Sequence, residues 1–483
     1  MSAIPSGWHI VRPERVIPEP VPSTSRLRAA FRPMSSATTS PEKSRRPAHG
    51  TAAAALRHRD FRIMWLGSFA SNVGTWMQTL VLPVYVADRT DSGAWVGLFY
   101  FAQLGPLLLL SIVGGMLADR FPRKPWMISL VVTQLVLSLV MAWFVGADAH
   151  LPWLFGVQLL IGIANALFAP ALQGTVPNLV DPRDLPGAIS LNSVMINGSR
   201  VIGPAVAAVL MARGVTTPQI LVLNAATFLF MVAALLRITV PPMTGVTRAH
   251  GLANLMAGVN IARRRTIVGR LLVGMSLFSL CSLAYVGLFP IIVKDAFGVD
   301  PTSTTYNWLY AVWGLGAMVG ALSIGTVLSQ VDKRRLIAPF FVGFAVTMTI
   351  FALLRSPAPA FPIGFLLGLF YFGLATSMLT VVQQNLLSGE RARVMSLWFM
   401  AFGGTVSVSG LAFGPVVDAI GPRPVMLFGA AAALGLAWWC DVSRRPVSTL
   451  ADETATGVDE AGSDAFESRG ATGLDEHGIT AGE

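Results

Sequence analysis

The sequence predicts an all-α protein whose helices cross a membrane, and three observations support this fold class. The 483 residues are 53% hydrophobic and only 12% charged, with a mean hydropathy of +0.62, whereas soluble globular chains are about 25% charged. Apolar runs of roughly 20 residues recur along the chain, and each is long enough to cross about 30 Å of hydrocarbon. Lys and Arg gather between these runs. We therefore expect lipid to surround the body of the protein.

Twelve apolar runs are long enough to be membrane spans. The loop at 238–266 is much longer than the other loops, so it divides the spans into two groups of six. The predicted spans are 62–87, 94–118, 125–146, 151–172, 188–211, 217–237, 267–293, 303–329, 336–355, 360–385, 395–418 and 422–441.

This division gives five regions. Residues 1–56 are rich in Pro, Ser, Thr, Ala and Arg and are expected to form a disordered basic tail. Bundles of six helices are predicted at 57–237 and 267–441. The linker 238–266 contains a weakly amphipathic stretch followed by arginines, which predicts a cytoplasmic surface helix. Residues 442–483 are acidic and almost free of aromatics, as in a solvated, disordered tail.

The short loops also predict orientation. Between residues 57 and 445, twenty Lys or Arg residues would lie on one side of the membrane and five on the other. Basic loops stay in the cytoplasm, so both termini are expected there, in a multi-pass protein of the cell (inner) membrane. The five residues on the opposite side are Arg89, Arg213, Lys294, Arg355 and Arg423.

Composition disfavours several functional classes. The net charge of +10 would suit nucleic acid, but the basic residues are spread over alternate loops, so no nucleic-acid partner is predicted. Cys281 and Cys440 have no metal-ligand spacing and all six histidines lie outside the apolar runs, so no metal or cofactor is predicted. The phosphate-binding loop Gly-x4-Gly-Lys-Ser/Thr is absent from the sequence. An enzyme is not expected.

The loop after the second span carries a ten-residue motif, Gly115-x-Leu-Ala-Asp-Arg-x-x-Arg-Lys124. It resembles the signature between the second and third helices of major facilitator superfamily transporters, with Pro122 where that family usually has Gly. The resemblance implies the major facilitator fold, in which two pseudo-symmetric six-helix bundles enclose a cavity. Weak similarity between loops six spans apart agrees with such duplicated halves.

The same resemblance implies a conformational latch. Asp119 would face the start of the eleventh span near Val394, where a helix N-terminus favours an anion. The latch residues carried over from the family are Gly115, Asp119, Arg120, Arg123 and Lys124.

Further segments narrow the resemblance. Asn72-Val-Gly-Thr-Trp-Met-Gln78 and Arg200-Val-Ile-Gly-Pro204 are among those that look like the enterobactin-exporter and macrolide-efflux branch, over about residues 56–440. Gly203 and Pro204 resemble the bend motif of the fifth helix in family antiporters, and we expect them to break this helix locally.

Arg200 is the strongest candidate for contact with a substrate. It lies about twelve residues from the cytoplasmic end of its span, roughly 18 Å deep, where a charge costs about 2.5–3.5 kcal/mol on insertion scales. It therefore either attracts an anionic group of the substrate, or senses a proton-linked charge change, or is a structural arginine satisfied by carbonyls and amides.

Polar residues inside the spans suggest the rest of the cavity. Asn72, Thr75 and Gln78 share one face of the first span, which would line a cavity or bond to a neighbouring helix. The other cavity candidates are Gln103, Gln134, Asn165, Asn197, Asn224, Tyr285, Tyr310, Tyr371, Gln383 and Gln384.

Proton coupling has little support from the spans themselves. All thirteen acidic residues between Leu56 and Asp441 lie in loops or at span ends, and Gln158 stands where many relatives place an arginine. Asp119 and Asp418 are the nearest candidates for a titrating group.

The sequence thus predicts a secondary-active exporter of a small molecule, such as a siderophore, a macrolide-like drug or a hydrophobic metabolite. Proton antiport is implied by the resemblance, and its expected partners are the substrate, protons and the lipid bilayer. Two alternatives stay open: a facilitator that imports a small solute, and a non-transporting receptor with the same fold.

Overall fold

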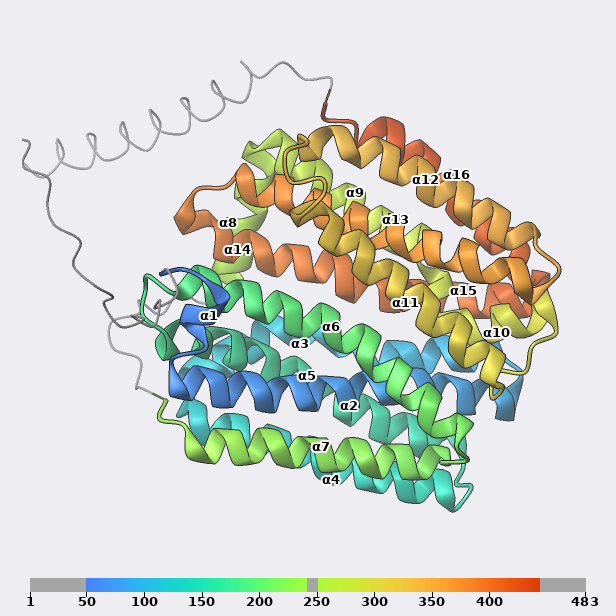
Figure 1. The fold of residues 1–483 in the computed structure, drawn as a ribbon, viewed down its shortest axis with the longest axis horizontal. Helices are drawn as coiled ribbons and strands as arrows, with labels where there is room; N and C mark the ends of the chain where they lie inside the picture. Colours follow the sequence, from blue (N-terminus) through green and yellow to red (C-terminus); the bar gives the residue numbers. More distant parts are fainter. Residues whose placement is uncertain (1–48, 241–250, 444–483) are drawn as a thin grey trace, which may run out of the picture. The chain divides into compact units, whose positions relative to one another are not determined.

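The computed structural model describes residues 49–240 and 251–443, which belong to one compact unit. Within these two ranges every regular element is helical and no strand occurs, so the all-α prediction is confirmed (Figure 1). The side chains of a few further residues, Asp119 and Asn197 among them, lie outside the described part of the structure.

The first half of the chain forms six long helices after a short one, α1. A 3-10 turn, Val176–Leu179, follows α5. The helices are α1 Ala52–Ala55, α2 Arg59–Thr90, α3 Gly93–Arg120, α4 Arg123–Gly146, α5 Leu151–Thr175, α6 Leu185–Ala212 and α7 Thr217–Arg237.

A linker helix, α8, runs from Gly251 to Arg264 and leads into the second half. The helices of that half are α9 Thr266–Ser282, α10 Ala284–Phe297, α11 Thr304–Gly325, α12 Lys333–Leu353, α13 Pro357–Gln384, α14 Ser388–Phe399, α15 Thr405–Ile420 and α16 Pro422–Trp439.

Helices occupy all twelve predicted span positions. Nine of them, among the described residues, are long and apolar enough to cross a membrane: α4, α5, α6, α7, α9 with α10, α11, α12, α13 and α14 with α15. The other three positions are filled by α2, α3 and α16, and the apolar stretch counted within α3 is Gly93–Leu108. The exact number of crossings stays a prediction.

Two predicted spans are interrupted. The seventh is divided at Leu283 into α9 and α10, at a point where the sequence has neither Gly nor Pro. The eleventh contains a π-helical turn, Met400–Gly404, between α14 and α15. Gly403 and Gly404 end this turn, and π turns of this kind are frequent at functional sites.

The segment 49–58 packs onto the first bundle, although residues up to 56 were expected to belong to a tail. The Asp184 carboxylate, just before α6, accepts a hydrogen bond from the Gly50 N–H at 3.0 Å and contacts His58 Nε2 at 3.0 Å. His49 Nδ1 lies 3.3 Å from the same carboxylate. These contacts, the Gly50 N–H first, lower the pKa of Asp184 to about 2.

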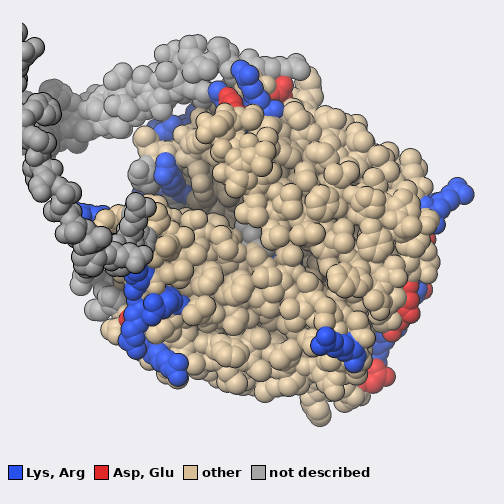
Figure 2. Space-filling view, in the orientation of Figure 1, with Lys and Arg blue, Asp and Glu red and all other residues tan. Residues whose placement is uncertain are grey.

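Charged side chains on the viewed face lie at the two ends of the helices, with an uncharged surface between them (Figure 2). We call the end where α2 begins and α3 ends the basic end, because it carries Arg57, Arg59 and Arg120, and the opposite end the far end. The uncharged belt between them is what lipid requires.

The two halves meet mainly along α3 with α15, and along α6 with α11. Glycines make the first contact possible, since a β-carbon on Gly97 would clash with the Gly410 oxygen and one on Gly414 with the Gly93 oxygen. Small residues of this kind let helix backbones approach closely in a membrane. The halves are therefore in direct backbone contact toward the far end.

Candidate substrate site between the two bundles

Arg200 lies in the middle of α6, and its guanidinium contacts both halves of the protein. The guanidinium carbon is 5.1 Å from the ring centroid of Trp76 on α2. On the side of the second half it lies 5.1 Å from the ring of Phe372 on α13 and 5.8 Å from that of Phe402 in the π turn. Each contact is within cation–π range, so three rings from two bundles surround one cation.

This cation has no anionic partner among the described residues. Its Nε atom is buried without a hydrogen-bond partner, and the ion pairs formed in the described ranges lie at helix ends and involve other residues. A charge at this depth costs about 2.5–3.5 kcal/mol on insertion scales, and cation–π contacts return about 0.5–2 kcal/mol each. The rings thus tolerate the charge and leave its N–H donors available to an anion.

An aromatic wall from the second half continues from Phe372 and Phe402. The Tyr371 ring lies 4.4 Å from that of Phe372 and 6.3 Å from that of Trp313. Trp313 Nε1 in turn donates a hydrogen bond to the Tyr285 hydroxyl at 3.2 Å. Tyr285 and Tyr310, both predicted cavity residues, are buried here.

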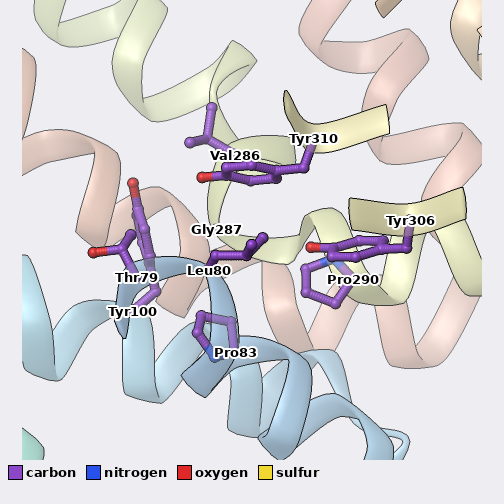
Figure 3. A pocket seen from close by; sticks show the side chains of 9 residues that line it. All are labelled: Thr79, Leu80, Pro83, Tyr100, Val286, Gly287, Pro290, Tyr306 and Tyr310. Carbon is purple, nitrogen blue, oxygen red and sulfur yellow. The ribbon is translucent and has the colours of Figure 1, made fainter. Parts of the chain in front are cut away.

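A small crevice between the halves lies beside this wall, toward the far end. In Figure 3, Tyr306 and Tyr310 of α11 lie over Pro290 and Gly287 of α10, and Tyr100 of α3 faces them from the other half. The remaining lining residues are Thr79, Leu80, Pro83 and Val286. The crevice joins four helices, two from each half.

The first half also contains a network of buried amides that joins α2, α5 and α7. Asn224 Nδ2 donates to Gln78 Oε1 at 2.6 Å, and Gln78 Nε2 donates to Gln158 Oε1 at 2.9 Å. All three side chains are buried and come from α7, α2 and α5. The structure thus places Gln78 in contact with neighbouring helices, and a direct contact with substrate stays a prediction for this residue.

The other polar candidates have different surroundings. Asn72 and Thr75 donate to carbonyls of their own helix, those of Ser68 and Ser71, and Gln103 donates to Thr79 Oγ1 at 2.6 Å beside the crevice. Gln383 is exposed near the end of α13, and Asn165 is half-buried on α5. The Asn197 side chain lies outside the described part.

Two of the five predicted latch residues bind helix ends within the first half. Arg123 donates to the Gly174 carbonyl at 2.6 Å, and Lys124 donates to the Ile238 carbonyl at 2.9 Å, which places cations at the C-terminal ends of α5 and α7. Arg120 is exposed, and the surroundings of Gly115 and of the Asp119 side chain lie outside the described part. The latch itself stays a prediction.

The expected break at Gly203 and Pro204 is not present, because α6 continues as one helix through both residues. Loss of one backbone donor at Pro204 does not end the helix here. A β-carbon on Gly203 would lie 2.5 Å from the Trp76 β-carbon and 2.7 Å from the Val73 oxygen. Gly203 therefore allows α6 to pack closely on α2, next to the ring that covers Arg200.

The other proton-coupling candidate, Asp418, lies near the end of α15 at the far end. It accepts hydrogen bonds from the first residues of α3, in the other half.

Sequence reasoning missed Phe372 and Phe402 as contacts of Arg200. Phenylalanines on apolar spans are indistinguishable from lipid-facing ones by composition. The one available signal was the Gly403–Gly404 pair directly after Phe402, because paired glycines weaken regular helix geometry.

Comparison with known proteins assigns the family. The model of the family described as transmembrane secretion effector, MFS_3, matches residues 50–456. The enterobactin exporter EntS of Escherichia coli O1:K1 / APEC is 26% identical over 354 residues, which cover 71% of this chain and 81% of the exporter. The enterobactin exporter of Shigella boydii serotype 18 has the same identity and coverage.

Solved structures show the same fold at low identity. The nucleoside transporter NupG superposes with a TM-score of 0.61 at 16% identity, covering 80% of this chain and 100% of NupG. A bacterial homolog of the human lysosomal transporter Spinster, in an inward-facing and unoccupied conformation, gives 0.61 at 14% identity, with 80% and 97% covered. The chain therefore belongs to the transmembrane secretion effector family of the major facilitator superfamily of membrane transporters.

Proposed function

We propose that this transporter exports a small molecule carrying an anionic group, by alternating access driven by proton antiport. The basic end would face the cytoplasm, with both termini there, because twenty Lys or Arg residues belong to loops on that side. The direction of transport is supported by the similarity to enterobactin exporters. Asp119 and Asp418 are the candidate carboxylates for proton coupling.

The observation that carries the proposal is the unpaired guanidinium of Arg200 between the two bundles. An anion bound there would form charge-assisted hydrogen bonds in a water-poor site, which are about twice as strong as neutral ones. The same anion would compete with the rings of Phe372 and Phe402 for the guanidinium charge. Binding would thereby weaken contacts that join the halves and favour their relative movement.

The experiment uses everted membrane vesicles energised by a proton gradient, with enterobactin and a macrolide as separate probes. We expect accumulation of enterobactin, whose catechol hydroxyls can ionise, loss of this accumulation when the gradient is collapsed, and retention of a metabolite in cells that lack the gene. Accumulation of the macrolide alone, which carries a basic amine and no acidic group, would support export but contradict an anionic substrate. Vesicles that accumulate neither probe, together with a deletion strain that retains no metabolite, would contradict export.

Arg200 variants test the anion site directly. Arg200→Ala should abolish accumulation of an anionic probe with near-normal expression, and Arg200→Lys should retain part of it because the charge persists without the planar fork. Arg213→Ala is the matched control, since it removes an exposed arginine that follows the same helix at the far end. Unchanged flux in Arg200→Ala would show that Arg200 is structural.

A further inference from the structure

We propose that Asp418 is a latch that holds the far end of the transporter shut by capping a helix of the opposite half. The proposal rests on the alternating access proposed above. It assigns Asp418 a positioning role that does not require contact with the substrate.

The geometry is that of an N-cap supplied by another helix. Asp418 on α15 accepts hydrogen bonds from the Ser92 hydroxyl at 2.8 Å, the Gly93 N–H at 2.5 Å and the Ala94 N–H at 3.0 Å. Gly93 is the first residue of α3, and the Ser92 side chain makes no cap bond of its own. The first N–H groups of a helix have no partner within it and attract an anion. Here the anion comes from the opposite half.

The backbone contact between Gly93 and Gly414 brings the carboxylate into range. A β-carbon on Gly93 would lie 2.9 Å from the Gly414 oxygen and 3.1 Å from Asp418 Oδ1. Among the described residues, the far end has one further bridge between the halves, from Lys294 Nζ to Asp91 Oδ1 at 2.8 Å. The Lys294 and Asp91 side chains are 35% and 63% exposed, and Asp418 is exposed as well. Asp418 makes three bonds to the opposite half, and two of them are to helix N-terminal N–H groups that have no partner in their own helix, so its contacts dominate.

Between fully described side chains, the hydrogen bonds and ion pairs that join the two bundles gather at the far end. They are the three Asp418 bonds and the Lys294–Asp91 pair. At the basic end, Arg265 pairs with Glu390, and Lys124 bonds only to carbonyls of its own half. The structure is thus held shut at the far end by bonds that would have to break before that end opens.

The two ends of one helix pair would then carry reciprocal latches. Asp418, near the end of α15, caps the start of α3, and Asp119, near the end of α3, is expected by family resemblance to face the start of α14. Because α3 and the eleventh span run antiparallel, the C-terminal end of each lies beside the N-terminus of the other. Each can therefore place its carboxylate at the start of the other helix. Opening one end would release one latch as the other forms.

The test measures opening of the far end without any substrate. The reporter is Val286→Cys, which lines the crevice, in a full-length chain with Cys281→Ser and Cys440→Ala. A membrane-impermeant maleimide is added to intact cells. We expect Asp418→Asn to raise the labelling rate roughly tenfold, as loss of hydrogen bonds to a charged group predicts, and Asp119→Asn to lower it below the parent. The double variant should lie between the two.

Asp300→Asn is the matched control, because Asp300 is also a far-end carboxylate but bonds only to Thr302 within its own half. Labelling in Asp418→Asn equal to that in Asp300→Asn would overturn the proposal. If the Asp418→Asn protein does not reach the membrane in normal amounts, Ser92→Ala is used in its place. This variant removes one of the three bonds and should still raise labelling severalfold, and unchanged labelling in Ser92→Ala would also overturn the proposal. If the vesicles show no export but Asp418→Asn still changes the labelling rate, the proposed function is contradicted and the Asp418 latch is not.

Discussion

The two halves of this transporter have the same helical plan but hold their interiors together differently. The first half joins its helices through buried amides, with Gln78 bonded to both Gln158 and Asn224. The second half has at its centre a cluster of rings, in which Phe278 contacts Phe341 at 5.3 Å and Phe344 at 4.9 Å.

The difference explains how one cation can lie between the halves. The amides of the first half bond to one another, whereas ring faces attract the Arg200 cation without neutralising it. The half that carries Arg200 on α6 is therefore stabilised independently of its charge. The half that faces it supplies two of the three rings.

The largest expected effect lies in the ring cluster. Phe278 is fully buried, so Phe278→Ala should leave a cavity and destabilise the protein by about 3–5 kcal/mol. Unfolding in mixed detergent micelles would measure it. A cost below that of the Gln78 variant described next would show that the second half does not depend on ring packing.

The amide network should give a smaller effect. Gln78→Leu keeps the side-chain size and leaves the Asn224 and Gln158 amides without their common partner, which should cost about 1–3 kcal/mol. The same unfolding assay applies, with Gln383→Leu at an exposed position as the control. If Gln78→Leu were as stable as Gln383→Leu, the amide network would not stabilise the first half, and the comparison between the halves would fail.

The contact between Phe402 and Arg200, which joins the halves, should contribute less free energy than the amide network. Phe402→Leu removes the ring but keeps apolar volume, so a double-mutant cycle with Arg200→Ala should give a coupling energy of about 0.5–1 kcal/mol. Phe402→Leu with Arg213→Ala should be additive. Additivity in both pairs would mean that the ring does not interact with the guanidinium.

The smallest effect concerns the segment 49–58. Asp184→Asn should speed hydrogen exchange at Gly50 and in α1, because the hydrogen bond from the Gly50 N–H to this side chain is weakened. The pKa of Asp184 is lowered from 3.8 to about 2, so its contribution is present above about pH 4 and is lost as pH falls toward 2. Exchange that is already fast in the parent at neutral pH would contradict this attachment.

Much of the fold could be predicted from sequence, because span length and loop charge are local properties of the chain. All twelve span positions hold helices. The division at Leu283 could not be predicted, since no helix-breaking residue stands there. The unbroken course of α6 through Pro204 was also missed, because composition does not show how neighbouring helices support a proline.

The candidate site could be predicted only on one side. Arg200 is conspicuous because a charge within an apolar run is costly. Its aromatic partners on α13 and in the π turn are apolar residues among many others, and only the packing of two distant segments distinguishes them. Asp418 stood out as an acidic residue at a span end, but its bond to Gly93 depends on the approach of two glycine-containing helices.

The π turn at Met400–Gly404 allows the eleventh span to contact Arg200 of α6 and the backbone of α3 with different faces. An extra residue in a turn rotates everything beyond it by about 100° relative to a regular helix. Trp398, just before the turn, and Phe402, within it, have ring centroids 6.4 Å apart, and beyond the turn the eleventh span presents Gly410 and Gly414 to α3. Removing one residue from this turn would swing the glycines away from α3 and leave bulkier side chains where two backbones now touch.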